Sequence, residues 1–246
     1  MAEQVRYSPV STKREDAVSV FCKPESDTKY AIGVDGATGK GEDYTSIQVW
    51  SRRLPFEQVA WFRSKTISTV AGSAVMVNLA KWYNNALLVI ETRFPGNAYQ
   101  DNAIETYRYQ NLYRKEDRLD TAPGVSAKFG ICTTEADKRL MVNETMRLLY
   151  APDGSQMVFH DPVTIEEFCN FVYIEDKGKV GAAPGSHDDT VMATMLAMRG
   201  CVLNPQKPRP KREKVTVDEH TAHMQYLLKK DFERVAGGQK SRLVRV

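Results

Sequence analysis

The sequence predicts an α/β fold in which an antiparallel three-strand meander is extended by parallel strands into a mixed sheet, with helices on its faces. Three observations support this prediction. Three β-rich segments follow one another between residues 30 and 64. A short apolar segment, "ALLVIE", follows a stretch with helical periodicity, as expected for a buried parallel strand. Further amphipathic segments follow towards the C-terminus, without internal repeats.

The meander consists of segments 30–36, 45–51 and 57–64, which are rich in β-branched and aromatic residues. Glycines between the first two segments supply the positive-φ positions of a hairpin turn. Residues 69–85 carry apolar residues at helical spacing and end at "NN", which predicts a helix. The strand that follows closes on Glu91.

The next elements are expected to be a helix at 98–107, a short strand near 111–114 and an irregular charged loop at 115–127. Thr134 then predicts a helix N-cap, with Asp137 at the third helical position. The apolar face expected for this helix contains four residues, Leu140, Val142, Met146 and Leu149.

The last third of the chain combines short elements with one long helix. "MVFHDP" predicts a strand, and "EEFCNFVYIED" is compatible with a helix or a strand. The glycine-rich "KGKVGAAPGSHDD" leads into an apolar helix at 190–200, after which the proline-rich "NPQKPRPKREK" ends the core.

Composition and charge bound the class of protein. The 246 residues are 42% hydrophobic and 26% charged, as in ordinary globular proteins, and no apolar run approaches the roughly 20 residues of a membrane span. We therefore expect a soluble, intracellular protein. The four cysteines, Cys22, Cys132, Cys169 and Cys201, form no C-x-x-C pair, so we expect reduced and mostly buried thiols and no structural zinc site.

We expect three parts: an N-terminal arm at 1–28, one domain at 29–204 and a basic tail at 205–246. The tail has 11 Lys or Arg against 5 Asp or Glu. Such a tail suits a nucleic-acid partner, although basic tails also serve to keep proteins soluble, and the sequence leaves both interpretations open.

The glycine-rich stretch "GVDGATGKGEDYTSIQVW" is no phosphate-binding loop. A P-loop around Lys40 would need glycine at position 34 and Ser or Thr at position 41, where the chain has Val34 and Gly41. No G-x-G-x-x-G runs into a helix either. The segment is instead a hairpin whose first strand ends on Asp35.

Carboxylates occur at three junctions between regular elements and loops. Asp35 ends the first strand, Glu91 ends the fourth, and Asp188 and Asp189 start the last helix. If the first and fourth strands are neighbours, these acids meet. Clustered carboxylates repel one another unless protons or cations neutralise them, and they suit Mg²⁺ or Mn²⁺. Two such ions support phosphodiester cleavage, so the pattern favours a nuclease.

Each acid also has a simpler interpretation. Asp35 can be a turn residue in "DG", and Asp188 and Asp189 can be helix N-caps. Glu91 is harder to explain in this way, because an acid that ends a buried strand needs a partner. The coincidence of all three positions favours the metal site.

Four segments together resemble the C-terminal nuclease domain of the large terminase subunit of tailed bacteriophages: "YAIGVDGATGKGEDYTSIQVW", "LLVIETRFPGNAY", "FGICTTEADKRLMVNETMRLLY" and "GSHDDTVMATMLAM". The resemblance covers about residues 29–201. It implies an RNase H-like fold and a metal-dependent endonuclease that cuts concatemeric viral double-stranded DNA during genome packaging. It also implies the cytoplasm of the infected bacterial host as its location.

The resemblance further implies site residues. Asp35 would bridge two Mg²⁺ or Mn²⁺ ions, and Glu91 and one acid of the "HDD" block would hold one ion each. Within that block we favour Asp189, but spacing leaves Asp188 open. Asp43 matches a further family acid and is a candidate auxiliary ligand.

Contacts to DNA and to partners are less specified. His187 is a candidate for the metal site or for DNA, and Lys128 and Arg139 are candidate phosphate contacts. The family implies an ATPase domain, a small terminase subunit and a portal protein as partners, and we expect the isolated domain to be monomeric. Because no P-loop is present, we expect an excised nuclease domain or a separately encoded nuclease. The alternatives are a resolvase or transposase of the same fold, an actin-like ATPase, or a non-catalytic DNA-binding docking module.

Overall fold

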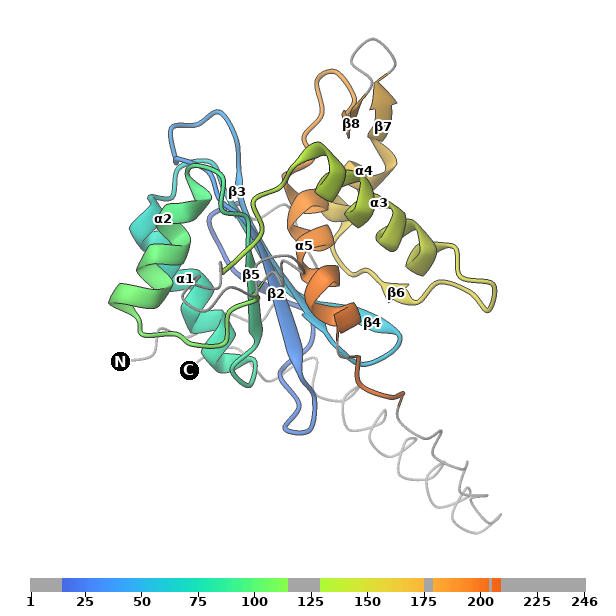
Figure 1. The fold of residues 1–246 in the computed structure, drawn as a ribbon, viewed down its shortest axis with the longest axis horizontal. Helices are drawn as coiled ribbons and strands as arrows, with labels where there is room; N and C mark the ends of the chain where they lie inside the picture. The colour runs from blue at the N-terminus through green and yellow to red at the C-terminus, as the bar shows by residue number, and fades with distance from the viewer. Residues whose placement is uncertain (1–14, 115–128, 175–178, 204, 209–246) are drawn as a thin grey trace, which may run out of the picture. The chain divides into compact units, whose positions relative to one another are not determined.

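The computed structural model describes residues 15–114, 129–174, 179–203 and 205–208. Regular elements within these ranges form a central mixed sheet with helices on both faces, and a small hairpin stands apart from the sheet (Figure 1). None of the helices in these ranges combines the length and the hydropathy that crossing a bilayer requires.

The central sheet contains six strands among the described residues, in the order β1-β4-β3-β2-β5, with β6 paired to β4. β2, β3 and β4 form an antiparallel meander, whereas β5 runs parallel to β2 and β6 runs parallel to β4. The predicted meander with parallel extensions is therefore confirmed. The strands of this sheet are β1 (Ser19–Val20), β2 (Tyr30–Asp35), β3 (Thr45–Ser51), β4 (Phe56–Ser64), β5 (Leu87–Ile90) and β6 (Met157–Val158).

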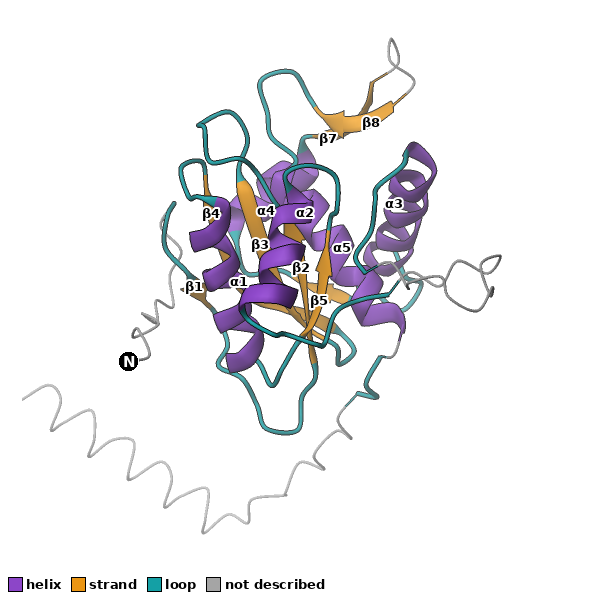
Figure 2. Ribbon diagram, turned by 60° about the vertical axis from the view of Figure 1, so that its left-hand side comes forward, coloured by secondary structure: helices purple, strands orange, loops and turns teal. Residues whose placement is uncertain are grey.

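Helices cover the two faces of the sheet in two groups. The first group packs with the large apolar cluster on one face: α1 (Thr69–Trp82), α2 (Gly96–Asp101) and the π-helical segment η1 (Asn102–Thr106). The second group lies on the other side of the sheet in Figure 1, and Figure 2 shows two of its members, α3 and α5, well separated from α1: α3 (Glu135–Leu149), α4 (Pro162–Cys169) and α5 (Asp189–Leu203).

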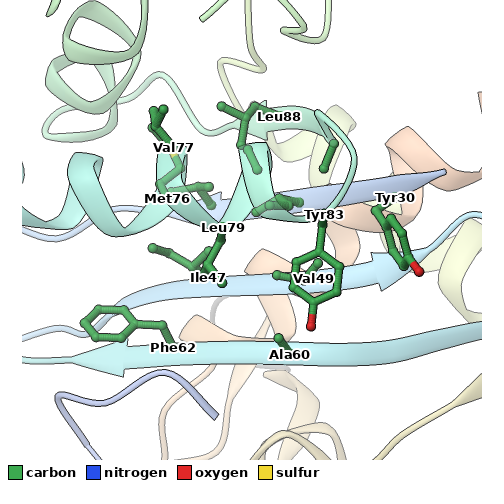
Figure 3. Close-up of a cluster of buried hydrophobic side chains, with 14 of the residues drawn as sticks. Tyr30, Ile47, Val49, Ala60, Phe62, Met76, Val77, Leu79, Tyr83 and Leu88 are labelled. Atoms are coloured by element: carbon green, nitrogen blue, oxygen red, sulfur yellow. The ribbon is translucent and has the colours of Figure 1, made fainter. Parts of the chain in front are cut away.

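Side chains of β2 alternate between these two groups of helices, as the two-residue period of a strand requires. Ile32 and Val34 join the apolar cluster that contains Met76 of α1 and Tyr83, the residue that follows this helix. Figure 3 shows Met76 and Tyr83 in this cluster. The alternate position Ala31 packs in a separate cluster with residues of α5. Asp35 is in phase with Ala31, so its side chain projects towards the α5 face.

Helix α5 approaches β2 more closely than a side chain would allow. A Cβ atom added to Gly33 would lie 1.8 Å from the carbonyl oxygen of Ala193, which is less than any van der Waals contact. Glycine at this position lets the helix backbone rest directly on the strand. The contact fixes α5 over the end of β2 that carries Asp35.

The N-terminal segment takes part in the sheet. Within the segment that we expect to be an extended arm or linker, residues 1–28, the short strand β1 pairs with β4, and Val20 is fully buried. After α5, Gln206 forms a bridge with Arg53. A two-residue strand is too short for periodicity to reveal, which explains why the sequence gives no sign of β1.

A hairpin of β7 (Phe171–Ile174) and β8 (Lys179–Ala182) stands beside α4. The ambiguous segment "EEFCNFVYIED" therefore contains the end of a helix followed by a strand. β8 lies in the glycine-rich stretch, for which the sequence predicts no strand, and its residues are largely unburied.

Helix α3 begins as predicted, with a reciprocal capping box between Thr134 and Asp137. Its buried face differs from the prediction. Met141 and Thr145 are buried, whereas Leu140 and Met146 are about half exposed. Hydrophobicity alone predicts the face of Leu140 and Met146. In the structure, packing of α3 against α5 buries the neighbouring positions Met141 and Thr145 instead.

Candidate active site

Asp35 ends β2 in a polar row that crosses the meander. It pairs with Ser46 of β3, and Ser46 pairs with Arg63 of β4. Because residues paired across strands project to the same face, all three side chains face the second group of helices. The row thus joins an acid to a buried arginine, and Arg63 is only 7% exposed.

Glu91 follows β5 directly and is held beside Asp35 by its backbone. Val34 pairs with Ile90 in parallel register, and the Glu91 N–H donates to the Val34 carbonyl oxygen at 3.0 Å. On the other side Glu91 forms a parallel bridge with Ile131. β2 and β5 are therefore neighbours, which meets the condition that the sequence left open, and their pairing brings the two acids together at the C-terminal ends of these strands.

Asp188 and Asp189 are positioned by a carboxylate from another helix. Glu167 of α4 accepts hydrogen bonds from the Thr190 N–H at 2.9 Å and from the Thr190 hydroxyl at 2.5 Å. It thereby satisfies donors at the N-terminus of α5, where no preceding turn can do so. Glu167 itself is buried and lies 3.0 Å from Arg63 in an ion pair.

A buried polar network fixes α4 against the sheet. The Gln58 amide donates to Gln48 at 2.8 Å and to the Thr164 hydroxyl at 3.2 Å, and Gln48 also donates to Thr164 at 3.1 Å. Asp161 caps α4 by accepting from the Thr164 N–H at 2.6 Å. Since these groups are buried and paired, they hold α4, and with it Glu167, in one position.

Burial and neighbouring acids raise the pKa of Asp35 and that of Asp189. Burial, then the charges of Glu91 and Asp189 and a hydrogen bond to Glu91, raise the pKa of Asp35 well above its usual value. Burial, then the charges of Glu167, Asp188 and Asp43, raise the pKa of Asp189 to about 7, although Arg63 opposes this shift. Such shifts indicate carboxylates that lack sufficient positive charge, which is the environment a divalent cation would relieve.

The two acids at the start of α5 have different neighbours. Asp188 lies 3.4 Å from the Lys138 ammonium of α3, in an ion pair. Asp189 lies 3.6 Å from Nδ1 of His187 and is 12% exposed, against 29% for Asp188. Asp189 is therefore the more buried of the two. Among the described residues, no Lys or Arg forms an ion pair with Asp189 as Lys138 does with Asp188.

Cations gather around the Tyr44 ring beside the acids. The Arg63 guanidinium lies 3.5 Å from the ring centroid and the Lys65 ammonium 4.5 Å from it. His187 contacts the ring edge-on, and its Nε2 lies 3.5 Å from the Lys65 ammonium. These residues adjoin a cavity of about 220 Å³ whose lining includes Tyr44, Arg63, Glu167 and His187.

The other predicted site residues are placed as follows. Asp43 is exposed on the β2–β3 connection, close enough for its charge to affect Asp189. Arg139 is exposed on α3, and its neighbour Lys138 makes the contact to Asp188 instead. Lys128 lies outside the described residues.

Sequence reasoning missed Glu167, Arg63 and Lys65. Glu167 lies in the segment whose helical or strand character the sequence leaves undecided, so its face could not be assigned. Arg63 lies on β4, and Lys65 directly follows the end of that strand. Arg63 pairs through Ser46 with Asp35, so a search for basic residues on the same face of the meander as Asp35 could have found it.

Acids at the C-terminal ends of the neighbouring parallel strands β2 and β5, in a mixed sheet with the N-terminus of α5 close by, are the arrangement of RNase H-like domains. Comparison with known proteins agrees. Residues 32–199 match the family model described as the terminase RNaseH-like domain, so the chain belongs to this family.

Solved structures show the same fold. The chain is similar to the large terminase nuclease from thermophilic phage G20c, solved with bound magnesium (20% identity, TM-score 0.60) and with bound cobalt (20%, 0.59); each match covers 76% of this chain and 89% of the other. It is also similar to the large terminase nuclease domain of Thermus phage P74-26 (18%, 0.57), over 78% of this chain and 87% of the other. The resemblance to terminase nuclease domains seen in the sequence is thereby confirmed.

Proposed function

We propose that this domain is a metal-dependent endonuclease that cuts concatemeric viral double-stranded DNA during genome packaging. One observation carries the proposal: Asp35 and Glu91 end adjacent parallel strands, and the pKa values of Asp35 and Asp189 are raised by burial and by neighbouring acids. A cluster of this kind at a site that also gathers Arg63 and Lys65 suits a cation together with a phosphate-bearing substrate.

The residues present fit divalent metal ions. Asp35, Glu91, Asp189 and Asp188 offer the hard oxygen donors that Mg²⁺ and Mn²⁺ prefer. Structures of the similar G20c nuclease contain magnesium, cobalt or zinc, which supports divalent ions as the class of cofactor. Such ions, when bound as a pair, activate water and stabilise the leaving oxygen in phosphodiester hydrolysis.

Different roles for the four acids follow from their neighbours. Asp35 is central, since the charges of Glu91, Asp189 and Asp188 all act on it, and it would hold both ions. Glu91 would hold one ion, and Asp189 the other. Lys138 neutralises Asp188, so we assign to Asp188 the role of supporting Asp189 rather than that of the third ligand.

DNA would approach over the Tyr44 side of the site. Lys65 and His187 are partly exposed there and carry the donors that phosphate oxygens accept. Arg63 is buried and paired with Glu167, so it orients the acids rather than the DNA. As a terminase domain, the protein would act in the host cytoplasm with a packaging ATPase domain, a small terminase subunit and a portal protein.

Cleavage of supercoiled plasmid by the purified chain tests the proposal, with Mg²⁺, Mn²⁺ or EDTA present. Nicking and linearisation that need a divalent ion, and that Asp35→Asn and Glu91→Gln each reduce by at least 100-fold, are expected. Asp153→Asn removes an exposed acid on a distant turn and should leave cleavage unchanged. Wild-type protein that binds DNA but cuts in none of the metals would contradict the proposal and favour a non-catalytic docking module.

A further inference from the structure

A second set of metal-ligating side chains lies beside β4, away from the acids at the ends of β2 and β5. Cys22 follows β1, Glu57 belongs to β4 and His160 follows β6. β1 and β6 both pair with β4, on the edge that β3 leaves free: Val20 pairs with Ala60, and Val158 pairs with Glu57. This arrangement brings three segments that are far apart in the sequence to one place.

The backbones of these segments are fixed by hydrogen bonds. The N–H groups of Phe21 and Cys22 donate to the Val59 carbonyl oxygen at 2.9 and 3.1 Å. The His160 N–H donates to the side-chain oxygen of Gln58 at 2.8 Å. Each ligand therefore projects from a position that the sheet already holds, so little ordering is needed to bring the three side chains together.

The three ligand atoms are already close. One atom from each of Cys22, Glu57 and His160 lies within 4.8 Å of the other two. Glu57 Oε1 accepts from the Cys22 thiol at 3.5 Å and lies 2.8 Å from Nε2 of His160. Ligand atoms around a tetrahedral zinc ion are about 3.4–3.8 Å apart, given bond lengths of about 2.0–2.3 Å, so small side-chain movements suffice.

We propose that Cys22, Glu57 and His160 form a binding site for Zn²⁺ that is separate from the acidic site. A thiolate, an imidazole and a carboxylate are the ligand types zinc takes, whereas Mg²⁺ avoids sulfur and imidazole. Glu57 and Arg63 are six residues apart on β4, so the two sites are separated by about 20 Å. The proposal does not depend on the nuclease function.

Binding of zinc at this site releases one proton from the Cys22 thiol. In the metal-free protein the Cys22 thiol donates to Glu57. Zinc displaces that proton to solvent, and the imidazole binds in its neutral form through Nε2. The side chains of His160 and Glu57 remain 34% and 39% exposed, which leaves room for a water molecule as the fourth ligand.

The expected consequence is structural. β1 is only two residues long, yet it attaches the N-terminal segment to the sheet. A zinc ion shared by Cys22, Glu57 and His160 would join that segment to β4 and to the segment after β6. Because only the folded chain brings the three ligands together, zinc should raise the stability of the domain.

Cobalt provides a specific probe, because a thiolate bound to Co²⁺ gives a near-ultraviolet charge-transfer band that carboxylates cannot produce. Titration of the full chain with Co²⁺ should produce this band, and in Asp35→Asn, where the acidic site no longer competes, it should saturate at one equivalent of metal per chain. Cys22→Ser should abolish it, and His160→Gln should weaken cobalt binding at least tenfold. Asp35→Asn, which affects only the acidic site, and Cys169→Ser, which removes an exposed thiol elsewhere, should leave the band intact.

Zinc protection provides a second measurement. Zn²⁺ at 100 times its dissociation constant should raise the melting temperature of Asp35→Asn, in which the acidic site is disabled, but not that of the double variants Asp35→Asn/Cys22→Ser and Asp35→Asn/Glu57→Gln. A cobalt spectrum without the thiolate band, or a band that survives Cys22→Ser, would overturn the proposal and leave a hydrogen-bonded cluster only. If Cys22→Ser fails to fold, Glu57→Gln and His160→Gln decide the same question.

Discussion

Glu167 of α4 caps the N-terminus of α5, accepting hydrogen bonds from both the backbone N–H and the hydroxyl group of Thr190. The acids Asp188 and Asp189 stand immediately before Thr190, so a residue far away in the sequence sets their position. The same carboxylate pairs with buried Arg63. The position of the start of α5 and the charge balance beside Asp188 and Asp189 therefore both depend on the Glu167 side chain.

Replacing the Glu167 side chain should lower the stability of the domain. Glu167→Ala leaves Arg63 buried without its partner and the N-terminus of α5 without its cap, so we expect a loss of roughly 3–5 kcal/mol of unfolding free energy. Urea unfolding monitored by circular dichroism measures it. Glu166→Ala, on the exposed side of the same helix, should change stability by no more than about 0.5 kcal/mol. Equal effects of the two substitutions would contradict the capping role.

Asp35→Asn should have opposite effects with and without metal. In EDTA the amide removes a charge that repels Glu91 and Asp189, so the free energy of unfolding should rise by about 1 kcal/mol or more. In Mn²⁺ the wild type gains binding energy that the variant lacks, and the order should reverse. Melting temperatures in the two conditions show this directly. A variant that is less stable in both would count against charge repulsion at Asp35.

Stability without metal should fall as the pH rises from about 4 to about 7. The folded-state pKa of Asp189 is raised to about 7 from a usual value of 3.8, and that of Asp35 is raised too. Between these values the folded state binds more protons than the unfolded state, so raising the pH favours unfolding, and the effect levels off above the folded pKa. Melting curves in EDTA across this range should show it, and Asp189→Asn should have a smaller slope. An unchanged slope would argue against the shifted pKa of Asp189.

Lys65 and Arg139 should differ as DNA contacts. Lys65 lies beside His187 and the Tyr44 ring, next to the acids, whereas Arg139 is exposed on α3. Lys65→Ala should weaken binding to a non-cleavable duplex and lower the slope of log affinity against log salt by about 1. Arg139→Ala serves as the matched loss of one positive charge. Fluorescence anisotropy at several salt concentrations compares them, and a larger effect of Arg139→Ala would reverse the assignment.

Much of the fold follows from local patterns in the sequence. The meander, the apolar strand before Glu91 and the capped start of α3 each have a period or a motif that spans several residues. The positions of Asp35 and Glu91 at strand ends also follow, whereas the pairing of β2 with β5, which brings the two acids together, is known only from the structure. These features depend on short-range order that a single sequence displays.

Other features depend on contacts between distant segments. Glu167 has no motif that marks it as a cap for Thr190, and β1 is too short to show a period. The expectation of mostly buried cysteines is wrong for Cys132 and Cys169, which are exposed, while Cys201 is buried. Residue type sets a preference for burial, but the packing of the elements decides it.

The direct contact of Gly33 with the backbone of α5 affects which ions the acidic site accepts. No flexible side chain separates the strand from the helix, so the main chains that carry Asp35 and Asp189 keep a fixed spacing. Ca²⁺ needs oxygen ligands at about 2.3–2.6 Å, compared with about 2.0–2.1 Å for Mg²⁺. A frame that cannot widen should therefore discriminate by ionic radius, so Ca²⁺ should bind the proposed site more weakly than Mg²⁺ and should not support cleavage.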